Sequence, residues 1–304
     1  YYDSIEIPAE KVGEAVTGIN VSDEMKEQGI KLNRNVEMTI RYIGFNMTDD
    51  IVGSPEKSTD AELEAKRQET LLKNRKLRQA MSLAIDSEEF IRVHLKGMGI
   101  NAHSPLPPGI FGHDPDYKGP YIYENEESLL KAKKLLTEAG YPNGIDPKTG
   151  KPLELTFTYS IRNPDDDLKM KFWIKCWSKI GLKVKADGNV YNIFQKKIYG
   201  KNFQIFTWGW HADYPDAENF LFLLSSATVP NPNHALYSNK EYDYYFDKLK
   251  SLTDDESTTW TDDKSGKKIT MSRGQLIKKC IDLLAEDSPW VFLYNEIKYE
   301  LYHN

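Results

Sequence analysis

The sequence is poor in the residues that mark metal sites and cross-linked folds. Among its 304 residues are two cysteines, Cys176 and Cys280, and six histidines, with no His-Glu-x-x-His motif and no EF-hand loop. Both cysteines stand in apolar, helical patterns, so we expect two buried thiols; the sequence leaves open whether they pair. Two cysteines cannot stabilise a chain of this length by disulfide bonding, so its core must carry the fold. We predict no bound metal and no cofactor.

Long apolar runs and an excess of basic residues are missing as well. No segment approaches the roughly 18 consecutive apolar residues of a membrane-spanning helix. The formal net charge is −6, and acidic and basic residues are intermixed. A nucleic-acid interface or a polybasic membrane surface would need Lys and Arg gathered on one face. We therefore expect no nucleic-acid partner.

The motifs of nucleotide binding and of nucleophilic catalysis are also absent. The sequence has no G-x-x-x-x-G-K-[ST] loop, no G-x-G-x-x-G loop and no G-x-S-x-G elbow. A carboxylate pair for glycoside hydrolysis could stand among the 46 acidic residues, but only geometry would reveal it. Nothing in the sequence points to catalysis, so we predict that the protein is not an enzyme.

The chain does contain strand-like and helical segments in alternation. Strand patterns are expected at 5–8, 36–47, 153–159, 182–186, 203–208 and 290–294. Helical patterns are expected at 9–16, 59–73, 74–86, 87–93 (capped by Ser87), 124–139, 165–180, 191–197, 219–224, 240–252 and 272–286. This alternation predicts an α/β domain with a mixed sheet flanked by helices. The polar stretch 253–270, with a turn at 264–267, is expected to be a surface insert.

Residues 207–226 (TWGWHADYPDAENFLFLLSS) are the most informative segment. We expect a buried strand that ends at Trp208 and a turn at Gly209 and Trp210. Open α/β sheets bind ligands at the carboxyl ends of strands. Three polar side chains would be presented there: His211, Asp213 and Tyr214. A Trp beside an Asp suits a cationic amine. Alternatively, Asp213 only caps a turn and Trp210 belongs to the core; the residues alone do not separate the two readings.

This segment resembles the G-W-x-A-D-Y motif of the bacterial solute-binding proteins of family 5, which include oligopeptide- and dipeptide-binding proteins. Further stretches resemble the same family in the same order: FNM at 45–47, NRKLRQAMSLAID at 74–86, SPLPPGIFGHDPD at 104–116 and LLKAKKLLTEAGYPNG at 129–144. The family consists of two-lobed clamshells of the type II periplasmic-binding-protein kind. The resemblance implies that residues 1–304 are the C-terminal ligand-binding lobe and that the N-terminal lobe is absent.

The resemblance also implies a function. The chain would belong to the substrate-binding component of an ABC importer, which captures oligopeptides between two lobes. Its partners would be a short peptide, the transmembrane subunits of the permease and the missing lobe. The location would be extracytoplasmic, with a lipid anchor possible in the full-length protein.

The family's site residues can be carried over by motif. Asp213 would pair with the peptide α-ammonium, Trp210 would wall the side-chain pockets, and Tyr191 would line the pocket from the start of a short helix. His211 stands at a position that varies in the family. Basic residues for the peptide C-terminus are sought around Lys196, Lys197 and Thr207.

Three alternatives remain open. An oligosaccharide could stack on aromatic residues and donate a hydroxyl to Asp213; the stacking residues would be Trp208, Trp210 and Tyr214. The same fold could serve as a peptide-sensing receptor domain. A nickel or other metal chelate is kept because of His211.

Overall fold

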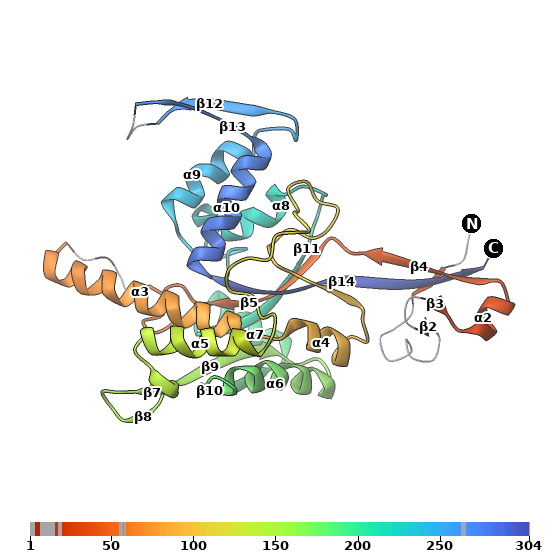
Figure 1. Cartoon of the computed structure of the whole chain (residues 1–304), viewed down its shortest axis with the longest axis horizontal. Helices are drawn as coiled ribbons and strands as arrows, with labels where there is room; N and C mark the ends of the chain where they lie inside the picture. Colours follow the sequence, from red (N-terminus) through yellow and green to blue (C-terminus); the bar gives the residue numbers. More distant parts are fainter. Residues whose placement is uncertain are drawn as a thin grey trace.

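The chain folds around a mixed β-sheet with helices on both faces (Figure 1). This computed structural model describes residues 4–6, 16–17, 20–54, 57, 59–262 and 266–303. Within them, eight strands form the main sheet in the order β1-β14-β5-β11-β9-β10, with β4 and β6 also paired to β14. The strands are β1 Ser4–Glu6, β4 Ile30–Val36, β5 Thr39–Phe45, β6 Gly99–Asn101, β9 Glu154–Ser160, β10 Lys183–Asn189, β11 Ile205–His211 and β14 Trp290–His303. The predicted α/β class with a mixed sheet is confirmed.

Three strands form the parallel part of the sheet. β9 and β10 pair along their whole length, whereas β11 pairs with β9 only at Ile205 and Phe206. On its other side β11 is antiparallel to β5. The sheet therefore changes direction at β11, between a parallel and an antiparallel neighbour.

The helices that connect these strands, α6 (Pro164–Ser178) and α7 (Tyr191–Tyr199), lie on opposite faces. Trp177 of α6 packs edge-on against Phe157 of β9. The next residue, Thr158, faces the other way and bonds Asp187, which Lys197 of α7 also holds. The connection from β9 to β10 and the connection from β10 to β11 run in opposite directions across the sheet. Because both crossovers are right-handed, their helices lie on opposite faces.

The first long helix differs from the prediction. Residues 59–73 and 74–86 were expected to form two helices, but α3 (Ala61–Leu83) is continuous. Asp60 caps it by accepting from two backbone N–H groups. Asn74 lies in its interior and donates to the backbone oxygens of Asp50 and Gly53. No Gly or Pro interrupts the segment, so nothing ends the helix there.

The other helices are close to the predicted positions. They are α4 Ser87–His94, α5 Glu126–Glu138, α6, α7, α8 Glu218–Leu221 with the 3₁₀ turn η3 Phe222–Leu224, α9 Lys240–Leu249 and α10 Arg273–Asp287. Asp86, and not Ser87, caps α4, because its carboxylate accepts the N–H of Glu89. The shorter elements are β2 Val16–Thr17, β3 Asn20–Val21, α2 Asp23–Glu27, η2 Pro142–Gly144, β7 Ile145–Asp146, β8 Lys151–Pro152 and η4 Ser226–Thr228.

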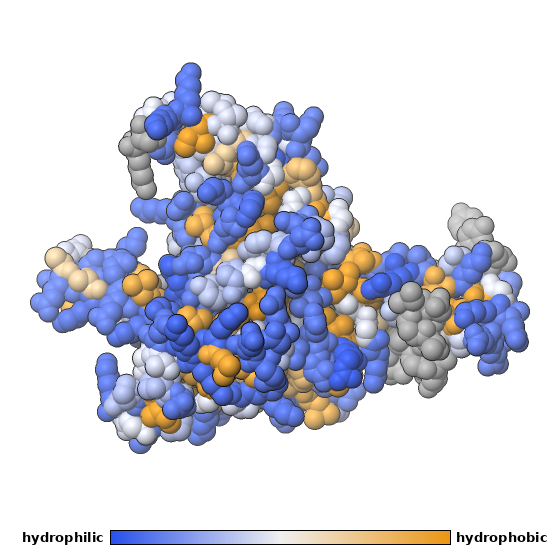
Figure 2. Space-filling model, in the orientation of Figure 1, coloured by the Kyte–Doolittle hydropathy of each residue, from blue (hydrophilic) through white to orange (hydrophobic). Residues whose placement is uncertain are grey.

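An arm built on the second half of β14, with β4 and β1 paired to it, extends from the body of the molecule (Figure 1). The strand predicted at 290–294 continues to His303, and its second half pairs with β4. The single strand predicted at 36–47 is two strands, β4 and β5, and most of β4 was not predicted. Both arm segments mix charged and apolar residues, which hides the strand pattern. Hydrophobic side chains gather where the arm leaves the body (Figure 2). A small cluster around Ile297 and Tyr299 lies along the arm.

The stretch 253–270 contains most of a β-hairpin, β12 (Ser257–Thr261) and β13 (Lys268–Ser272), which lies beside α9 and α10. Its turn at 264–267 falls partly outside the described residues. The predicted helix 9–16 and part of the strand 5–8 also lie outside them, apart from Val16 in β2.

The main core fills the space between the sheet and its helices. Cys176 and Cys280 belong to it, and both are buried and free, which confirms the expected pair of buried thiols. No helix in the described part of the chain is long and apolar enough to cross a membrane.

Candidate functional site

Strand β11 runs further than the sequence predicted. Gly209 and Trp210 do not turn the chain but continue the strand, paired with Arg41 and Ile40 of β5. The strand ends at His211. Antiparallel pairing with β5 therefore holds the backbone of β11 up to His211, and the bond from Ala212 N to Met38 O continues it to the start of the segment Asp213–Asp216.

One edge of β11 is open. Backbone bonds from Asn46 N to Gln204 O and from Ala212 N to Met38 O mark the even-numbered residues as those bonded to β5. Because bonded and non-bonded residues alternate in antiparallel pairs, the odd-numbered residues point their N–H and C=O groups the other way. Among the described strands, none pairs with that edge beyond Phe206. The backbone groups that remain available are those of Thr207, Gly209 and His211.

A cleft of about 460 Å³ opens beside this edge. Beyond Phe206, β9 remains paired with β10 and β11 remains paired with β5, so the two pairs of strands separate there. The cleft reaches both faces of the sheet, because Trp173 comes from the α6 side and Phe194 from the α7 side. Ser160 and Arg162 line it from the carboxyl end of β9. The full lining is Arg41, Phe90, Leu95, Ser160, Arg162, Asp166, Lys169, Met170, Trp173, Tyr191, Phe194, Thr207, Trp208, Gly209, Leu293, Tyr294 and Glu296.

Aromatic rings form one wall of the cleft. Trp208 stacks on Phe194 with ring centroids 5.1 Å apart, and Tyr191 lies 6.5 Å from the same indole. His234 contacts Trp208 on another side, at 4.7 Å. Trp208 is therefore held between α7 and the loop that carries His234. Burial lowers the pKa of His234, which favours its neutral form.

The charged residues of the cleft are partly paired within the protein. Arg41 binds Glu296, with Nε and Nη2 each 2.9 Å from Oε1. The Asp166 carboxylate accepts the backbone N–H groups of Arg162 and Asn163 at the start of α6. The guanidinium of Arg162 lies 5.7 Å from the centre of the Tyr191 ring. Arg41 crosses beneath β11, where Gly209 has no side chain to obstruct it.

Asn219 braces the loop that follows β11. Its Oδ1 accepts hydrogen bonds from the Trp210 indole and from the backbone N–H of Asp213, both at 3.0 Å. Trp210 also packs edge-on against Phe222. The bond to Asn219 fixes the backbone of Asp213. The Asp213 side chain is exposed, so its carboxylate faces solvent. Trp210 thus has a structural role in fixing this loop.

The structure divides the predicted site residues into two groups. Tyr191 and Trp208 line the cleft. The others continue along the end of β11 and the loop after it, outside the lining: Trp210, His211, Asp213 and Tyr214. His211 is exposed and lies 3.9 Å from Glu37, and the Tyr214 hydroxyl bonds Glu218. Lys197, a candidate for the peptide C-terminus, is held by Asp187.

The sequence interpretation missed the polar residues on the α6 side of the cleft. Arg162 follows the carboxyl end of β9, so the rule that selected residues 211–214 could have found it. Arg41 could not be found in this way, because its place depends on the register between β5 and β11. The residues concerned are Arg41, Ser160, Arg162, Lys169 and Trp173.

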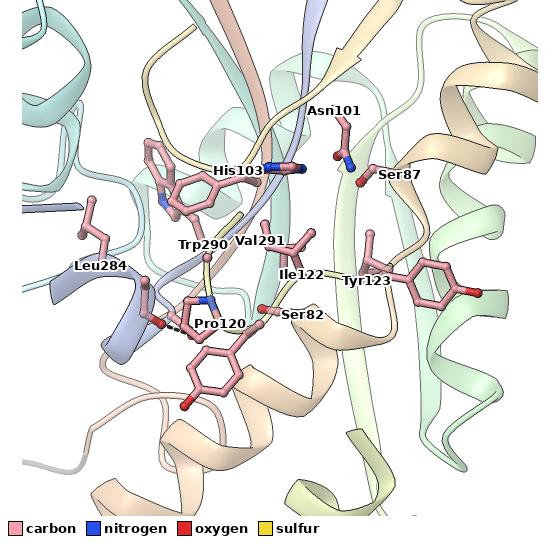
Figure 3. A pocket seen from close by; sticks show the side chains of 16 residues that line it. Ser82, Ser87, Asn101, His103, Pro120, Ile122, Tyr123, Leu284, Trp290 and Val291 are labelled. Atoms are coloured by element: carbon pink, nitrogen blue, oxygen red, sulfur yellow. Dashed lines mark hydrogen bonds between the residues drawn. The ribbon is translucent and has the colours of Figure 1, made fainter. Parts of the chain in front are cut away.

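A second cavity, of about 30 Å³, lies between the end of α3, the 101–123 loop and the start of β14 (Figure 3). His103, Asn101 and Ser87 lie on one side of it, and Ser82 and Pro120 on the other. Its volume suits one or two water molecules and not a solute. It is enclosed by other elements than β11 and is not the candidate site. Within the described residues, no three His, Cys, Asp or Glu side chains gather as a metal site would require.

Comparison with known proteins identifies relatives. A family model described as "Bacterial extracellular solute-binding proteins, family 5 Middle" matches residues 9–232. The heme-binding protein A of Haemophilus influenzae is 30% identical over 219 residues, which cover 72% of this chain and 36% of that protein. The oligopeptide-binding protein AppA of Bacillus subtilis is 28% identical over 279 residues, covering 88% of this chain and 44% of that protein.

Solved structures give the same fold. The periplasmic binding protein DppA of Helicobacter pylori, in complex with the peptide STSA, superposes with a TM-score of 0.69 at 22% identity. The match covers 99% of this chain and 48% of that one. The type II periplasmic-binding-protein fold is thus confirmed. The chain spans about half the length of the structures that it matches, and less than half of the curated relatives.

Proposed function

The chain belongs to the bacterial extracellular solute-binding proteins of family 5, and on that premise we propose that it is one lobe of the peptide-binding component of an ABC importer. It would bind peptides without chemical change and hand them to the transmembrane subunits of a permease. Its relatives are named for heme, glutathione, dipeptide and oligopeptide binding. Among these ligands, the geometry of β11 favours an extended peptide.

The open edge of β11 carries this proposal. The backbone groups of Thr207 and Gly209 face the cleft instead of a neighbouring strand, and those of His211 follow on the same unpaired edge just beyond the lining. An extended peptide can add to such an edge, and its main-chain bonds give affinity that does not depend on its side chains. Stacking on Trp208 and Tyr191 would accommodate varied side chains. A sugar would use the aromatic wall but would leave the backbone groups of β11 less well satisfied.

Asp213 would receive the α-ammonium of the peptide. Its carboxylate is exposed just beyond the end of β11, while Asn219 holds its backbone in place. A charge-assisted bond to an ammonium needs such an unobstructed carboxylate. Trp210 and Tyr214 would flank this end of the ligand. His211 would contribute its backbone, and we propose no metal for it.

The rest of the ligand's contacts would come from a second lobe. The chain spans about half of the solved structures that it matches. We propose that residues 1–304 form the C-terminal lobe, that the arm of β4 and β14 leads toward its partner lobe, and that closure of the two lobes buries the peptide. The protein would act outside the cytoplasm, with or without a lipid anchor.

Calorimetric titration with tetra-alanine and its N-acetylated form tests the proposal. Both the 304-residue chain and the full-length gene product that contains it are titrated, each as wild type and as Asp213→Asn. We expect free tetra-alanine to bind the full-length protein, and N-acetylation or Asp213→Asn to weaken binding at least tenfold, or about 1.4 kcal/mol. Asp255→Asn, which removes a carboxylate from the exposed hairpin region, is the matched control.

The outcomes test the peptide ligand and the role of Asp213 separately. If the folded full-length protein gives no heat with tetra- or penta-alanine but binds an oligosaccharide, the peptide ligand is wrong. If peptides bind and N-acetylation makes no difference, the peptide reading stands and Asp213 loses its role. If the neighbouring genes encode a kinase instead of a permease, the alternative function as a peptide-sensing receptor domain is favoured.

A further inference from the structure

The hairpin of β12 and β13 has a strand edge that no other described strand covers. Figure 1 shows β12 as the outer strand, with β13 on the side of α10. Among the described strands, β12 pairs with β13 alone. No described residue of the hairpin belongs to the lining of the cleft. The open edge of β12 is therefore a surface feature separate from the candidate site.

The backbone bonds of the hairpin show which residues of β12 face outward. Asp262 N donates to Lys267 O, and Arg273 N donates to Glu256 O, at the two ends of the ladder. The register between these bonds is unbroken. Because bonded and non-bonded pairs alternate in an antiparallel ladder, the even-numbered residues of β12 bond to β13. The odd-numbered residues point their N–H and C=O groups away from β13.

Three residues therefore offer main-chain groups at the open edge of β12: Ser257, Thr259 and Thr261. Their side chains are exposed. Trp260 points to the other face of the hairpin, where its ring lies 6.1 Å from the Tyr244 ring of α9. Packing on α9 thus holds the strand in place, while its outer edge stays accessible to another chain.

The strand lacks the features that normally keep an edge strand unpaired. Natural proteins protect such edges with a charge, a proline or a bulge within the strand. The five residues of β12, STTWT, are uncharged, and their register with β13 has no bulge. Threonine and tryptophan also favour extended backbone. An extended segment of another protein can add to an edge of this kind through main-chain bonds.

Acidic residues stand at both ends of β12, in the runs 254–256 and 262–263. The carboxylates of Asp255 and Glu256 accept hydrogen bonds from Thr253, and they form no ion pair with a described residue. A segment that pairs with β12 would place its own two ends beside this negative charge. Charge complementarity therefore favours a segment with basic residues at both ends.

A second copy of the same strand fits this edge poorly. An antiparallel pair of β12 strands centred on Thr259 would place Glu256 opposite Asp262 of the other copy. Like charges directly opposite each other are destabilising. The exposed Lys268 stands on β13, one strand further from the open edge. The acidic ends of β12 thus select against self-pairing.

We propose that the open edge of β12 binds an extended segment of a partner protein that carries Lys or Arg at both ends. The outward main-chain groups of Ser257, Thr259 and Thr261 pair with the backbone of that segment, and the acidic runs bind its ends. This surface goes beyond peptide capture, because the hairpin lies outside the cleft. The two proposals can therefore fail independently.

Fluorescence anisotropy with a synthetic strand tests the surface. The probe is N-acetylated, fluorescein-labelled Lys-Lys-Val-Thr-Val-Thr-Val-Lys-Lys-amide, and the comparison probe has Glu in place of the four Lys. Both are titrated with the full-length gene product in the presence of excess tetra-alanine, which competes for the cleft. We expect the basic probe to bind at least tenfold more tightly, and to slow hydrogen exchange at residues 257–261.

Thr259→Pro removes an outward N–H group without removing a bond of the hairpin ladder, and proline is tolerated at such an edge. We expect it to weaken the basic probe at least tenfold. Thr259→Val keeps the N–H group and is the matched control. The double variant Asp255→Asn, Glu256→Gln should reduce the preference for the basic probe. It decides the question alone if chemical denaturation shows that Thr259→Pro does not fold.

Equal affinities for the two probes would overturn the proposal. So would a basic probe that Thr259→Pro, when folded, binds as tightly as the wild type does, because the probe then binds elsewhere. Sedimentation velocity of the wild type tests for self-pairing. If the protein dimerises and Thr259→Pro abolishes the dimer, the occupant of the edge is a second copy and the basic-ended partner is wrong.

Discussion

Arg273 and Asp216 form an ion pair of 2.6 Å across 57 residues of sequence. The Arg273 side chain is 3% exposed, although it stands at the first position of α10, and it also holds Asp254 at 2.5 Å. Asp216 belongs to the loop that carries Asp213, and its carboxylate accepts the N–H of Glu218 at the start of α8. Arg273 thus ties the loop after β11 to the helix that leads into β14.

The first prediction concerns this clamp. Arg273→Met is expected to lower the free energy of unfolding by about 2–3 kcal/mol, less than for a fully buried pair because Asp216 and Asp254 are partly exposed. It should also weaken binding of free tetra-alanine more than that of its N-acetylated form, since the loop then positions Asp213 less well. Chemical denaturation and calorimetry measure the two effects.

Asp254→Asn is the control for Arg273, because it removes the partner that lies outside the ligand loop. It should lower stability slightly and leave the preference for the free amine unchanged. If Arg273→Met weakens both peptides equally, Arg273 supports the fold and does not position Asp213.

The second prediction concerns Gly209. A Cβ on this residue would lie 2.4 Å from Nη1 of Arg41, so Gly209→Ala must displace the Arg41 side chain. We expect this shift to weaken the bond of Arg41 to Glu296 and to change the position of its guanidinium in the cleft that it lines. We expect peptide affinity to fall at least tenfold with a change in unfolding free energy below about 2 kcal/mol. Gly150→Ala is a comparison far from the cleft. Its added Cβ would have no atom within 4 Å, so the variant measures the cost of backbone strain at a positive φ without a clash. An unchanged affinity for Gly209→Ala would argue against a ligand beside β11.

The same strand shows what the sequence could and could not predict. The apolar run before Trp208 correctly predicted a buried strand, and the polar residues after it led to the prediction of a ligand site at the end of that strand. Its end was predicted three residues early, because Gly209 is a strong turn signal and pairing with β5 is not visible in the sequence. Arg41, on the α6 side of the cleft, was missed for a related reason, because its place depends on the register between β5 and β11. Arg162 could have been found, since it follows the carboxyl end of β9.

The third prediction concerns acid stability. Burial alone would raise the pKa of Asp187, but hydrogen bonds from Lys197 and Thr158 outweigh it and lower the pKa below its usual value. A lowered pKa adds stability above the unfolded value of about 3.9, and this stability is lost as the pH falls through the folded value. Asp187→Asn should therefore destabilise the protein at pH 7 and flatten the loss of stability below about pH 4. Denaturant unfolding between pH 2.5 and 7 measures this. If the wild type and the variant lose stability in parallel, Asp187 is not responsible.

The fourth prediction concerns the two thiols. Cys176 and Cys280 are free and buried, and burial raises the pKa of both above the ordinary value. Only the thiolate reacts quickly with thiol reagents. The native protein should therefore react with Ellman's reagent only at the rate of its unfolding, and two thiols should react at once in denaturant. Rapid labelling of one thiol in the native protein would show that its helix opens locally.

The last prediction concerns the hairpin of β12 and β13, expected from the sequence to be a surface insert. It contacts α9 through Trp260, whose ring lies 4.6 Å from Nζ of Lys248 in a cation–π arrangement and 6.1 Å from the Tyr244 ring. Replacing residues 259–270 by Gly-Gly-Ser removes Trp260 but keeps Asp254, which binds Arg273, and Ser272, which caps α10. A contact of this kind contributes about 0.5–1 kcal/mol at an exposed site. We expect a loss of unfolding free energy below about 2 kcal/mol and unchanged affinity for tetra-alanine. A shortened chain that binds peptide at least tenfold more weakly would instead make the hairpin part of the binding lobe.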